Sequence, residues 1–390
     1  MRNINQLRGT VAITGIGLAG MGNATGFSEM EILAKSAHTA VRDAGLKMSD
    51  IDGIFTASFN RFLPTLSVAE YLGINPTYMD STNIGGSAYV SCLKNAAMAL
   101  NSGACNAVLV AYGSTAFSAS DFRQQIAARA QLEPQVFEAP YAPFNPATSY
   151  ALTAARHMHE FGTSREQLAN VAVAARQWAQ ANPLAFRREP LAVEDVLSAR
   201  MVSDPLTTLD CCLITDGAGA FVMTRADRVG PGAEPPVYVL GVAASQTHRQ
   251  ISCMPDLTST AARESGAQAF AMAGLSPKDI HAAQLYDAFT INVLLFLEDL
   301  GFCAKGDGGA FIAETGIGPG GALPVNTNGG GLSCVHPGMY GIFTVIEAVE
   351  LLRTNGQSRG LQAVDAVLCH GNGGVLASQS TAILGTQAAL

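Results

Sequence analysis

Apolar and polar residues follow one another along this chain in blocks typical of alternating helices and strands. Ala-rich helices are predicted at residues 29–43 and 261–272, and a strand-like run follows each of them, at 53–58 and 283–286. Strands that alternate with helices favour mainly parallel sheets covered by helices on both faces. We therefore predict an α/β fold.

One block of sequence occurs twice. The segment Ala44-Gly-Leu-Lys-Met-Ser-Asp-Ile51 recurs as Ala273-Gly-Leu-Ser-Pro-Lys-Asp-Ile280, between the helix and the strand in each case. A repeated block indicates a repeated structural unit, with matching elements on either side of it.

Glycine turns mark a second matched pair. Gly85-Gly-Ser87 opens an apolar helix at 88–100, which a strand follows at 107–111. Gly329-Gly-Gly331 precedes, after a short loop, a helix at 340–352 and then a strand at 364–369. The matched order predicts an internal duplication, with the two glycine-opened helices facing one site.

The duplication divides the chain into residues 1–228 and 229–390, with the Pro/Gly-rich stretch Val229–Pro236 as the linker. The first half is longer because about 114–207 is inserted near its end. This insertion contains a predicted helix at 165–181, with Ser164 as its cap and Pro183 as its stop. Such an insertion forms a lid or pocket wall, or else serves packing or a dimer surface.

Composition narrows the class of protein. Of 390 residues, 48% are hydrophobic and 14% charged, and the net charge is −8, which argues against disorder, nucleic acid and anionic membranes as partners. No run approaches the roughly 20 apolar residues of a membrane span. Eight scattered cysteines without a C-x-x-C pair indicate buried free thiols in a reducing, cytoplasmic compartment, and we predict no metal site.

The segment Val11–Gly20 carries glycines at 15, 17 and 20 and superficially matches a dinucleotide fingerprint. The fingerprint requires a helix that opens directly on its glycines, whereas the next clear helix begins near Ser28. We therefore interpret this segment as a strand and turn, and not as a nucleotide site.

Four other segments concentrate candidate chemistry, because each lies at a predicted strand end or helix start, where α/β sheets bind ligands and free backbone N–H groups stabilise negative charge. They are Thr82-Asn-Ile-Gly-Gly-Ser87, Leu285-Tyr-Asp-Ala-Phe-Thr290, Asn326–Gly341 with its His-Pro-Gly-Met-Tyr-Gly end, and Leu368-Cys-His-Gly-Asn-Gly-Gly374.

These segments, in this order on a duplicated α/β chain, resemble the thiolase superfamily, especially its sterol-carrier-protein-x branch, over nearly the whole chain. The middle region adds Ser164-Arg-Glu-Gln-Leu-Ala, Asp195–Met201 and Asp204–Ala218 to the likeness. The resemblance implies a five-layered α-β-α-β-α thiolase fold, a homodimer, and coenzyme A thioesters as substrates, with no covalently bound cofactor.

The chain departs from that family at the position of its nucleophilic cysteine. Counting from Asn83 puts Gly86 there, and counting back from Gly113 puts Ser87 there. Cys92 would lie more than one turn inside the helix, as a core residue. Ser87 is a nucleophile if His336 takes its proton, or else only caps the helix and offers its N–H.

The remaining candidates are phenols and an imidazole. By resemblance, His336 in His-Pro-Gly-Met-Tyr-Gly forms an oxyanion hole and activates a nucleophile. Tyr286 replaces an Asn or His of the family, and is either an acid or base or a sheet-packing residue. Asp287 is expected to hold backbone geometry, and Tyr340 is a second, weaker phenol candidate.

The last glycine turn offers two neighbouring proton carriers. Cys369 matches the family's second cysteine by register, and His370 is its rival, since side chains alternate along a strand and only one of the two can face the site. The N–H of Gly371 joins that of residue 86 or 87 as a second oxyanion site.

Together these residues predict a thiolase-like enzyme that makes or breaks a C–C bond next to a CoA thioester, by Claisen or retro-aldol chemistry. Relatives without the cysteine use tyrosines and a small zinc-ribbon/OB-fold partner subunit, which the resemblance also implies. The alternative is a non-catalytic subunit that binds acyl-CoA or supports such a partner. Phe186-Arg-Arg188 meets CoA phosphates or is a solvated surface.

Overall fold

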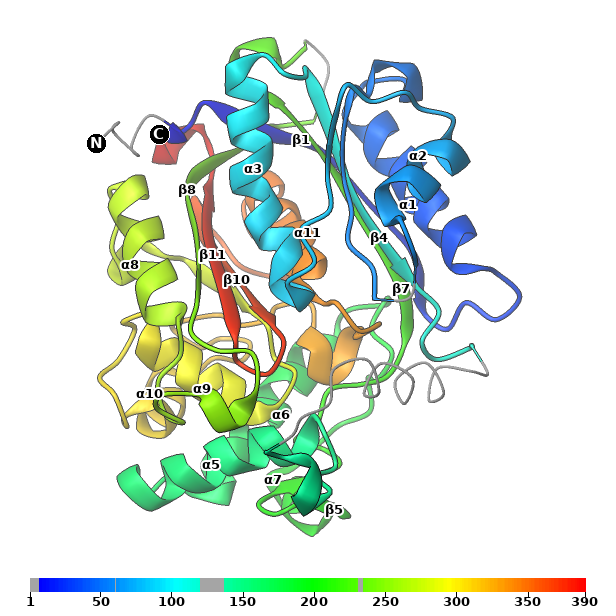
Figure 1. Ribbon diagram of the computed structural model, residues 1–390. Helices are drawn as coiled ribbons and strands as arrows, with labels where there is room; N and C mark the ends of the chain where they lie inside the picture. The colour runs from blue at the N-terminus through cyan, green and yellow to red at the C-terminus, as the bar shows by residue number, and fades with distance from the viewer. Residues whose placement is uncertain (1–6, 60, 120–136, 231–233) are drawn as a thin grey trace.

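The computed structural model describes residues 7–59, 61–119, 137–230 and 234–390. Two successive sets of strands and helices make up the fold (Figure 1). The first set comprises β1 (Val11–Gly22), α1 (Glu29–Asp43), β2 (Gly53–Phe55), α2 (Pro64–Leu72), β3 (Tyr78–Asp80), α3 (Ala88–Ser102), β4 (Ala107–Ser114), α5 (Ala147–Phe161), α6 (Arg165–Gln180), α7 (Val193–Ser198), β5 (Met201–Ser203), β6 (Leu206–Thr207) and β7 (Asp216–Arg225). The second comprises β8 (Val237–Gln246), α8 (Ala262–Ala273), β9 (Ala282–Leu285), α9 (Thr290–Asp299), α10 (Gly308–Thr315), α11 (Gly341–Arg353), β10 (Ala366–Gly373) and β11 (Ser378–Gly385).

The strands repeat one pairing pattern in the two sets. The main sheet has the order β3-β2-β4-β7-β1-β8-β11-β10-β9. We call the part from β3 to β1 the first arm of the sheet and the part from β8 to β9 the second arm. In the first arm β2 pairs in parallel with β4, and β7 pairs antiparallel with both β4 and β1. In the second, β9 pairs in parallel with β10, and β11 pairs antiparallel with both β10 and β8. Val325, bridged in parallel to Ala283, takes the place that β3 has in the first arm. The predicted duplication is confirmed.

Mainly parallel sheets were the wrong expectation, because both arms are mixed. A short turn after Gly373 joins β10 directly to β11, and a connection of that length permits only antiparallel pairing. The two arms meet at β1 and β8, which pair over Ala12 and Ile13.

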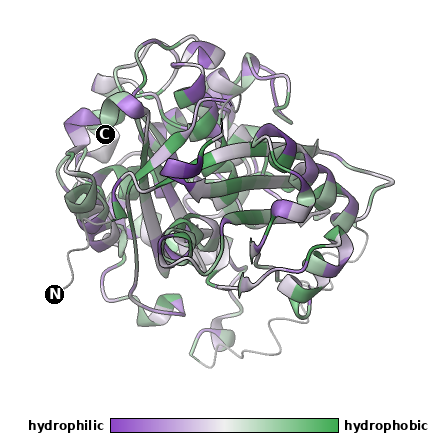
Figure 2. Ribbon diagram, turned by 90° about the horizontal axis from the view of Figure 1, so that it is seen from above, coloured by the Kyte–Doolittle hydropathy of each residue, from purple (hydrophilic) through white to green (hydrophobic). Residues whose placement is uncertain are grey.

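Five layers result from this arrangement, as the resemblance implied. In Figure 1, α1 and α2 cover the outer face of one arm, α8 covers the outer face of the other, and α3 and α11 lie between the arms. Figure 2 shows hydrophobic colour along the central strands and hydrophilic colour mainly on outer helices and loops. Most side chains of α11 are buried, so the central helices form the core from which the site is built.

Glycines in β1 and β8 let the outer helices pack closely. A Cβ atom on Gly15 would lie 2.0 Å from the carbonyl oxygen of Ala40 in α1, and one on Gly241 would lie 2.1 Å from that of Ala269 in α8. The strand continues to Gly22 without the predicted turn, so Gly15 lies within a strand that carries helix α1 against it. Close helix packing, rather than a phosphate, accounts for these glycines.

The insertion lies at one end of the molecule, where α5, α6, α7 and β5 gather below the sheet (Figure 1). Helix α6 begins as predicted at Ser164, whose hydroxyl accepts a hydrogen bond from the N–H of Gln167. Arg176 on α6 donates from Nε to Ser333 Oγ over 2.9 Å, which ties the insertion to the glycine-rich segment of the second half. Residues 120–136 of the insertion and 231–233 of the predicted linker lie outside the described residues.

No helix within the described ranges combines the length and hydropathy that a membrane crossing needs. Across the same ranges, His, Cys, Asp and Glu side chains do not gather in any group of three that could hold a metal ion.

Candidate active site

The starts of the two central helices touch. Before α3, the short turn η3 (Gly85–Ser87) leads into the helix. A Cβ atom on Gly341, the first residue of α11, would lie 2.1 Å from the carbonyl oxygen of Gly86. A Cβ atom on Gly86 would in turn lie 2.2 Å from the ring of Tyr286. Glycine is therefore required at both starts, because backbone and a phenol ring occupy the space of a side chain.

Two tyrosines hold the loop between His336 and α11. Tyr112 at the end of β4 donates its O–H to Pro337 O over 2.7 Å and accepts the N–H of Met339 at 3.1 Å. Tyr286, just after β9, donates to Gly338 O over 3.2 Å and accepts the N–H of Tyr340 at 3.1 Å. Each arm of the sheet thus supplies one phenol, and the two phenols fix consecutive peptide groups.

His336 presents an unpaired nitrogen in this cluster. Its ring meets that of Tyr286 edge-on, with centroids 5.6 Å apart. The Nε2 atom is buried and has no hydrogen-bond partner among the residues that the structure describes. Burial lowers the pKa of the imidazole to about 4, so the ring is neutral near pH 7. A neutral imidazole can exchange a hydrogen bond with a bound substrate at Nε2.

Tyr340 and Asp287 lie beside Tyr286 and His336 and complete the cluster. Tyr340 is fully buried, lies edge-on to Tyr286 at 5.5 Å, and donates its O–H to Asn328 Oδ1 over 3.3 Å. The Asp287 carboxylate accepts the backbone N–H of Gly331 at 2.6 Å and of Leu332 at 3.3 Å, and burial raises its pKa to about 7. Asp287 thereby fixes the short helical turn η8 (Gly330–Cys334).

The Ser87 side chain takes neither of the two roles that the sequence suggested for it, nucleophile or helix cap. Its Oγ lies 3.1 Å from Ile84 O and 3.0 Å from Ser378 Oγ, on the side of β11, and it bonds neither His336 nor a free N–H of the helix. The physical reason is that Ser87 already has helical backbone angles inside η3, so its side chain points into the core. Asn83 lies apart, with its amide 3.5 Å from Ser58 O in the loop after β2.

Cys369 and His370 point to opposite faces of β10, as strand alternation predicted. The Cys369 thiol faces α11 and donates to Thr344 O over 3.4 Å, and burial raises its pKa well above the usual range. His370 faces α9, where its ring lies 4.4 Å from that of Phe296. Gly371 follows on the inner face, and a Cβ atom there would lie 3.0 Å from Ser87 Cα. The predicted second oxyanion position thus adjoins the start of α3.

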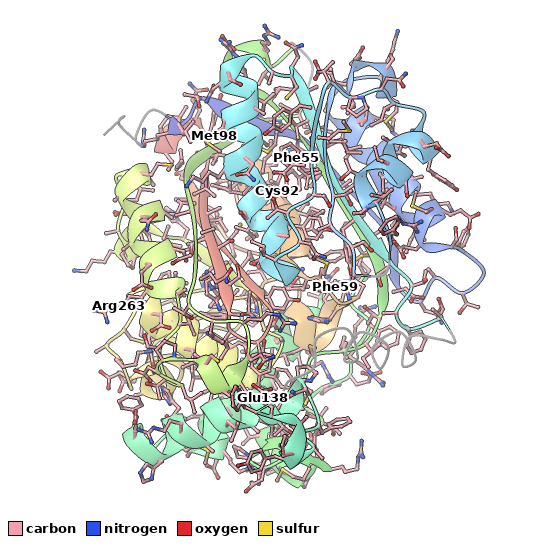
Figure 3. The ribbon with its side chains drawn as sticks, in the orientation of Figure 1. Phe55, Phe59, Cys92, Met98, Glu138 and Arg263 are labelled. Atoms are coloured by element: carbon pink, nitrogen blue, oxygen red, sulfur yellow. The ribbon has the colours of Figure 1, made fainter. Side chains whose placement is uncertain are left out.

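The other candidates from sequence lie outside this cluster. Cys92 is buried in the body of α3, away from the helix start (Figure 3). Arg187 lies over the ring of Phe186, and Arg188 donates to Gln180 O at the surface.

The sequence did not single out Tyr112, nor the buried polar side chains of Tyr150 and Asn292. A tyrosine at the end of an apolar strand, such as Tyr112, is indistinguishable from a core residue by pattern. Asn292 did carry a signal, because it interrupts the apolar run Ile291–Leu297 of a fully buried helix, and a buried polar residue is informative.

Fold and site together define a duplicated, five-layered α/β protein whose two central helix starts converge on phenol and imidazole groups. Family models support this description from sequence: the model described as "Thiolase, N-terminal domain" matches residues 10–227, and "Thiolase C-terminal domain-like" matches 243–386. The chain belongs to the thiolase family.

Individual relatives agree with this assignment. The chain is 34% identical to the "Steroid side-chain-cleaving aldolase" of Thermomonospora curvata, across 94% of this chain and 96% of the relative. It is 34% identical to the "17-hydroxy-3-oxo-4-pregnene-20-carboxyl-CoA lyase" of Mycobacterium tuberculosis, across 89% and 92%. A solved structure, the "Ltp2-ChsH2(DUF35) aldolase", superposes with a TM-score of 0.86 at 33% identity, across 97% of this chain and 98% of that chain. The predicted class, a thiolase-like enzyme acting on acyl-CoA thioesters, is confirmed.

Proposed function

We propose that this enzyme cleaves the bond between the α- and β-carbons of a 3-hydroxyacyl-CoA by a retro-aldol reaction, without a covalent acyl-enzyme. The observation that carries the proposal is the buried cluster of Tyr286, Tyr340 and the unpaired His336 Nε2 against Gly86. Oxyanion donors and a proton carrier suffice for an enolate, and a nucleophile is not required.

The reaction balances with these groups alone. The β-hydroxyl gives its proton to the Tyr286 oxygen, the electrons of the Cα–Cβ bond pass to the thioester as an enolate, and the Tyr286 phenol gives a proton to the α-carbon. Products are an aldehyde or ketone and a shortened acyl-CoA. In our proposal the neutral His336 Nε2–H donates to the enolate oxygen, since a histidine of lowered pKa stabilises negative charge without giving up its proton.

Tyr286 is the proposed proton carrier. Its hydroxyl lies between Gly338 O and the N–H of Tyr340, so it is held in place and also supplied with a donor that stabilises a transient phenolate. Burial nevertheless holds the pKa of Tyr286 well above its ordinary value. The resting group is thus a neutral phenol, which takes the β-hydroxyl proton only as it releases its own proton to the α-carbon, and both transfers accompany bond cleavage.

The thiol chemistry of ordinary thiolases finds little support in this chain. Gly86 and Ser87 occupy the start of α3 in either register, and Cys92 lies inside the helix with its pKa raised far above the usual range by burial. Because the thiolate is the nucleophile, such a thiol is inert near pH 7. The branch that lacks the cysteine, related to sterol carrier protein x, is therefore our proposed placement.

The proposal also includes a small partner subunit and a homodimer. The structure named Ltp2-ChsH2(DUF35) aldolase contains a second component, so we propose that this chain also works with a small DUF35-type subunit, the zinc-ribbon/OB-fold partner expected from the sequence. A homodimer remains a prediction of the family likeness. It is compatible with β3 at the open end of the sheet, where Met79 is exposed.

The test uses the full chain, alone and co-expressed with a small DUF35-type subunit. Mass spectrometry follows 3-hydroxyacyl-CoA substrates, including steroid side-chain CoA esters, to carbonyl and shortened acyl-CoA products. Tyr286→Phe and His336→Ala should each abolish cleavage, while Tyr71→Phe, on exposed helix α2, should not.

Two outcomes would replace the proposal. No turnover by any preparation, together with retained acyl-CoA binding, would favour a non-catalytic subunit. An acyl adduct on Ser87 in intact protein would restore the nucleophile hypothesis despite the direction of its side chain.

A further inference from the structure

A buried chain of hydrogen bonds leads from His370 to Tyr150. His370 Nε2 lies 2.9 Å from Gln379 Oε1, and Gln379 Nε2 donates to Asn372 Oδ1 over 2.9 Å. Asn372 Nδ2 then donates to the hydroxyl oxygen of Tyr150 over 2.8 Å. All four side chains are buried, so these hydrogen bonds connect β10 and β11 to helix α5 of the insertion through the protein interior.

Each residue in this series donates a hydrogen bond to the next, from His370 towards Tyr150. Since Gln379 uses its N–H on Asn372, its carbonyl oxygen must accept from His370, and the other ring nitrogen then accepts from Thr381, 2.9 Å away. At the far end Tyr150 receives an N–H and must direct its own O–H elsewhere. The acceptor on hand, Gly374 O, lies 3.4 Å away, a long distance for an O–H donor.

Tyr150 reaches the same region as the catalytic cluster. Its ring stacks on Phe289 with centroids 4.3 Å apart, three residues after Tyr286. The glycine turn that its hydroxyl meets abuts the start of α3, because a Cβ atom on Gly85 would lie 2.7 Å from the N atom of Gly374. Tyr150 therefore approaches η3 from the insertion, as Tyr286 does from β9.

Asn292 lies near Tyr150 and the backbone of Tyr286, and it leaves one acceptor unused. Its Nδ2 donates to the backbone carbonyl oxygen of Tyr286 over 3.4 Å, and its amide opposes the rise that burial causes in the pKa of Tyr150. The Tyr286 carbonyl can only accept, which fixes the orientation of the amide. Asn292 Oδ1 is then buried with no partner among the described residues. Such an acceptor costs free energy unless a ligand meets it.

We infer that Tyr150 and Asn292 form a subsite for the hydroxyl group on the β-carbon of the substrate. Asn292 Oδ1 accepts the substrate O–H, and Tyr150 donates its O–H to the same oxygen. His370, Gln379 and Asn372 are positioning residues that fix the donor direction of Tyr150. This inference rests on the proposed function, because it assigns the oxygen that becomes the carbonyl of the product.

Calorimetry on the full chain tests the subsite with two probes, 3-hydroxyhexanoyl-CoA and hexanoyl-CoA, whose integrity is checked by mass spectrometry after each titration. The wild-type chain should prefer the hydroxylated probe by about tenfold, the value of one or two satisfied hydrogen bonds. Tyr150→Phe should remove most of the preference and leave the affinity for hexanoyl-CoA unchanged. Tyr141→Phe, an exposed phenol on the same insertion, is the matched control and should change neither affinity.

Asn292→Leu separates binding from folding. The leucine removes the buried unpaired oxygen, which is stabilising, and also the long 3.4 Å hydrogen bond to the Tyr286 carbonyl, which is destabilising. The melting temperature should therefore change by only a few degrees, while the preference for the hydroxylated probe is lost. A wild-type chain without the preference, or a Tyr150→Phe variant that keeps it, would overturn the inference. If the preference exists but no probe is cleaved, the proposed function fails and the subsite stands.

Gln379→Glu tests the positioning chain. A glutamate still accepts from His370 but cannot donate to Asn372, so the direction of the chain is lost. As a single substitution, Gln379→Glu should reduce the preference for the hydroxylated probe. Added to Tyr150→Phe, it should cause no further reduction. An equal reduction in both backgrounds would show that the chain does not act through Tyr150.

Discussion

Tyr112→Phe separates a general loss of stability from a specific loss of catalysis. The change removes one oxygen that accepts the buried N–H of Met339 and donates to Pro337 O. Each buried backbone group left unpaired costs ~1–3 kcal/mol and two are left, so the free energy of unfolding should fall by ~2–6 kcal/mol. The loop after His336 also loses one of its two phenol supports.

Tyr89→Phe is a close control. Tyr89 packs against Tyr112 with ring centroids 5.2 Å apart, and its hydroxyl also bonds two buried backbone atoms, but these are the N and O of Ala57 and not atoms of the His336 loop. Both variants should therefore lose similar stability. Only Tyr112→Phe should lower kcat, by about tenfold or more, because small displacements of a catalytic group are costly.

Urea unfolding followed by circular dichroism measures stability, and turnover of a 3-hydroxyacyl-CoA at a temperature where both variants are folded measures catalysis. Equal kcat values for the two variants would refute the reasoning, whether both fell or neither did. In that case the Tyr112 hydroxyl would contribute to the core and not to the position of His336.

Three further predictions follow from burial and close packing. The acid limb of kcat/KM should fall through about pH 4 and not near pH 6.5, because burial lowers the pKa of His336; an acid limb at its ordinary value would contradict this environment. Asp287 binds its proton more tightly in the folded chain, so stability should decrease by on the order of 4 kcal/mol as pH rises from about 4 to above 7, and Asp287→Asn should flatten that part of the urea-unfolding profile. Gly15→Ala and Gly241→Ala should each cost ~3 kcal/mol or more, since their methyl groups would meet helix backbone, whereas Gly230→Ala, in open space, should be neutral in thermal melts.

Periodicity and repeats were enough to predict most of the central elements. Helices α1, α3, α8 and α11 lie within one or two residues of their predicted ranges, because each has a continuous apolar pattern and a glycine or serine at its start or end. Strands β7 and β11 were not predicted, and the antiparallel pairing that they introduce was missed with them. Strand direction depends on how a chain returns to the sheet and leaves no mark on the local pattern.

The candidate site was predictable in its membership but not in its contacts. The family resemblance, together with the glycines around His336 and the strand end at Tyr286, identified both residues from sequence patterns. They could not show that Ser87 points to β11, which depends on a helical turn already formed before α3. They could not show either that the partners of His370 are Gln379 and Thr381, since those contacts join strands across the sheet.

The duplicated framework explains why these contacts escaped a local view of the sequence. The two halves repeat their backbone, yet they contribute different things at their common centre: the first half provides space, at Gly86, and one supporting phenol, Tyr112, while the second provides His336 and Tyr286. Neither half holds the loop alone, because its two phenol supports come from opposite arms of the sheet. A substitution in either half that moves its phenol therefore displaces the same loop, and the position of His336 depends on both halves.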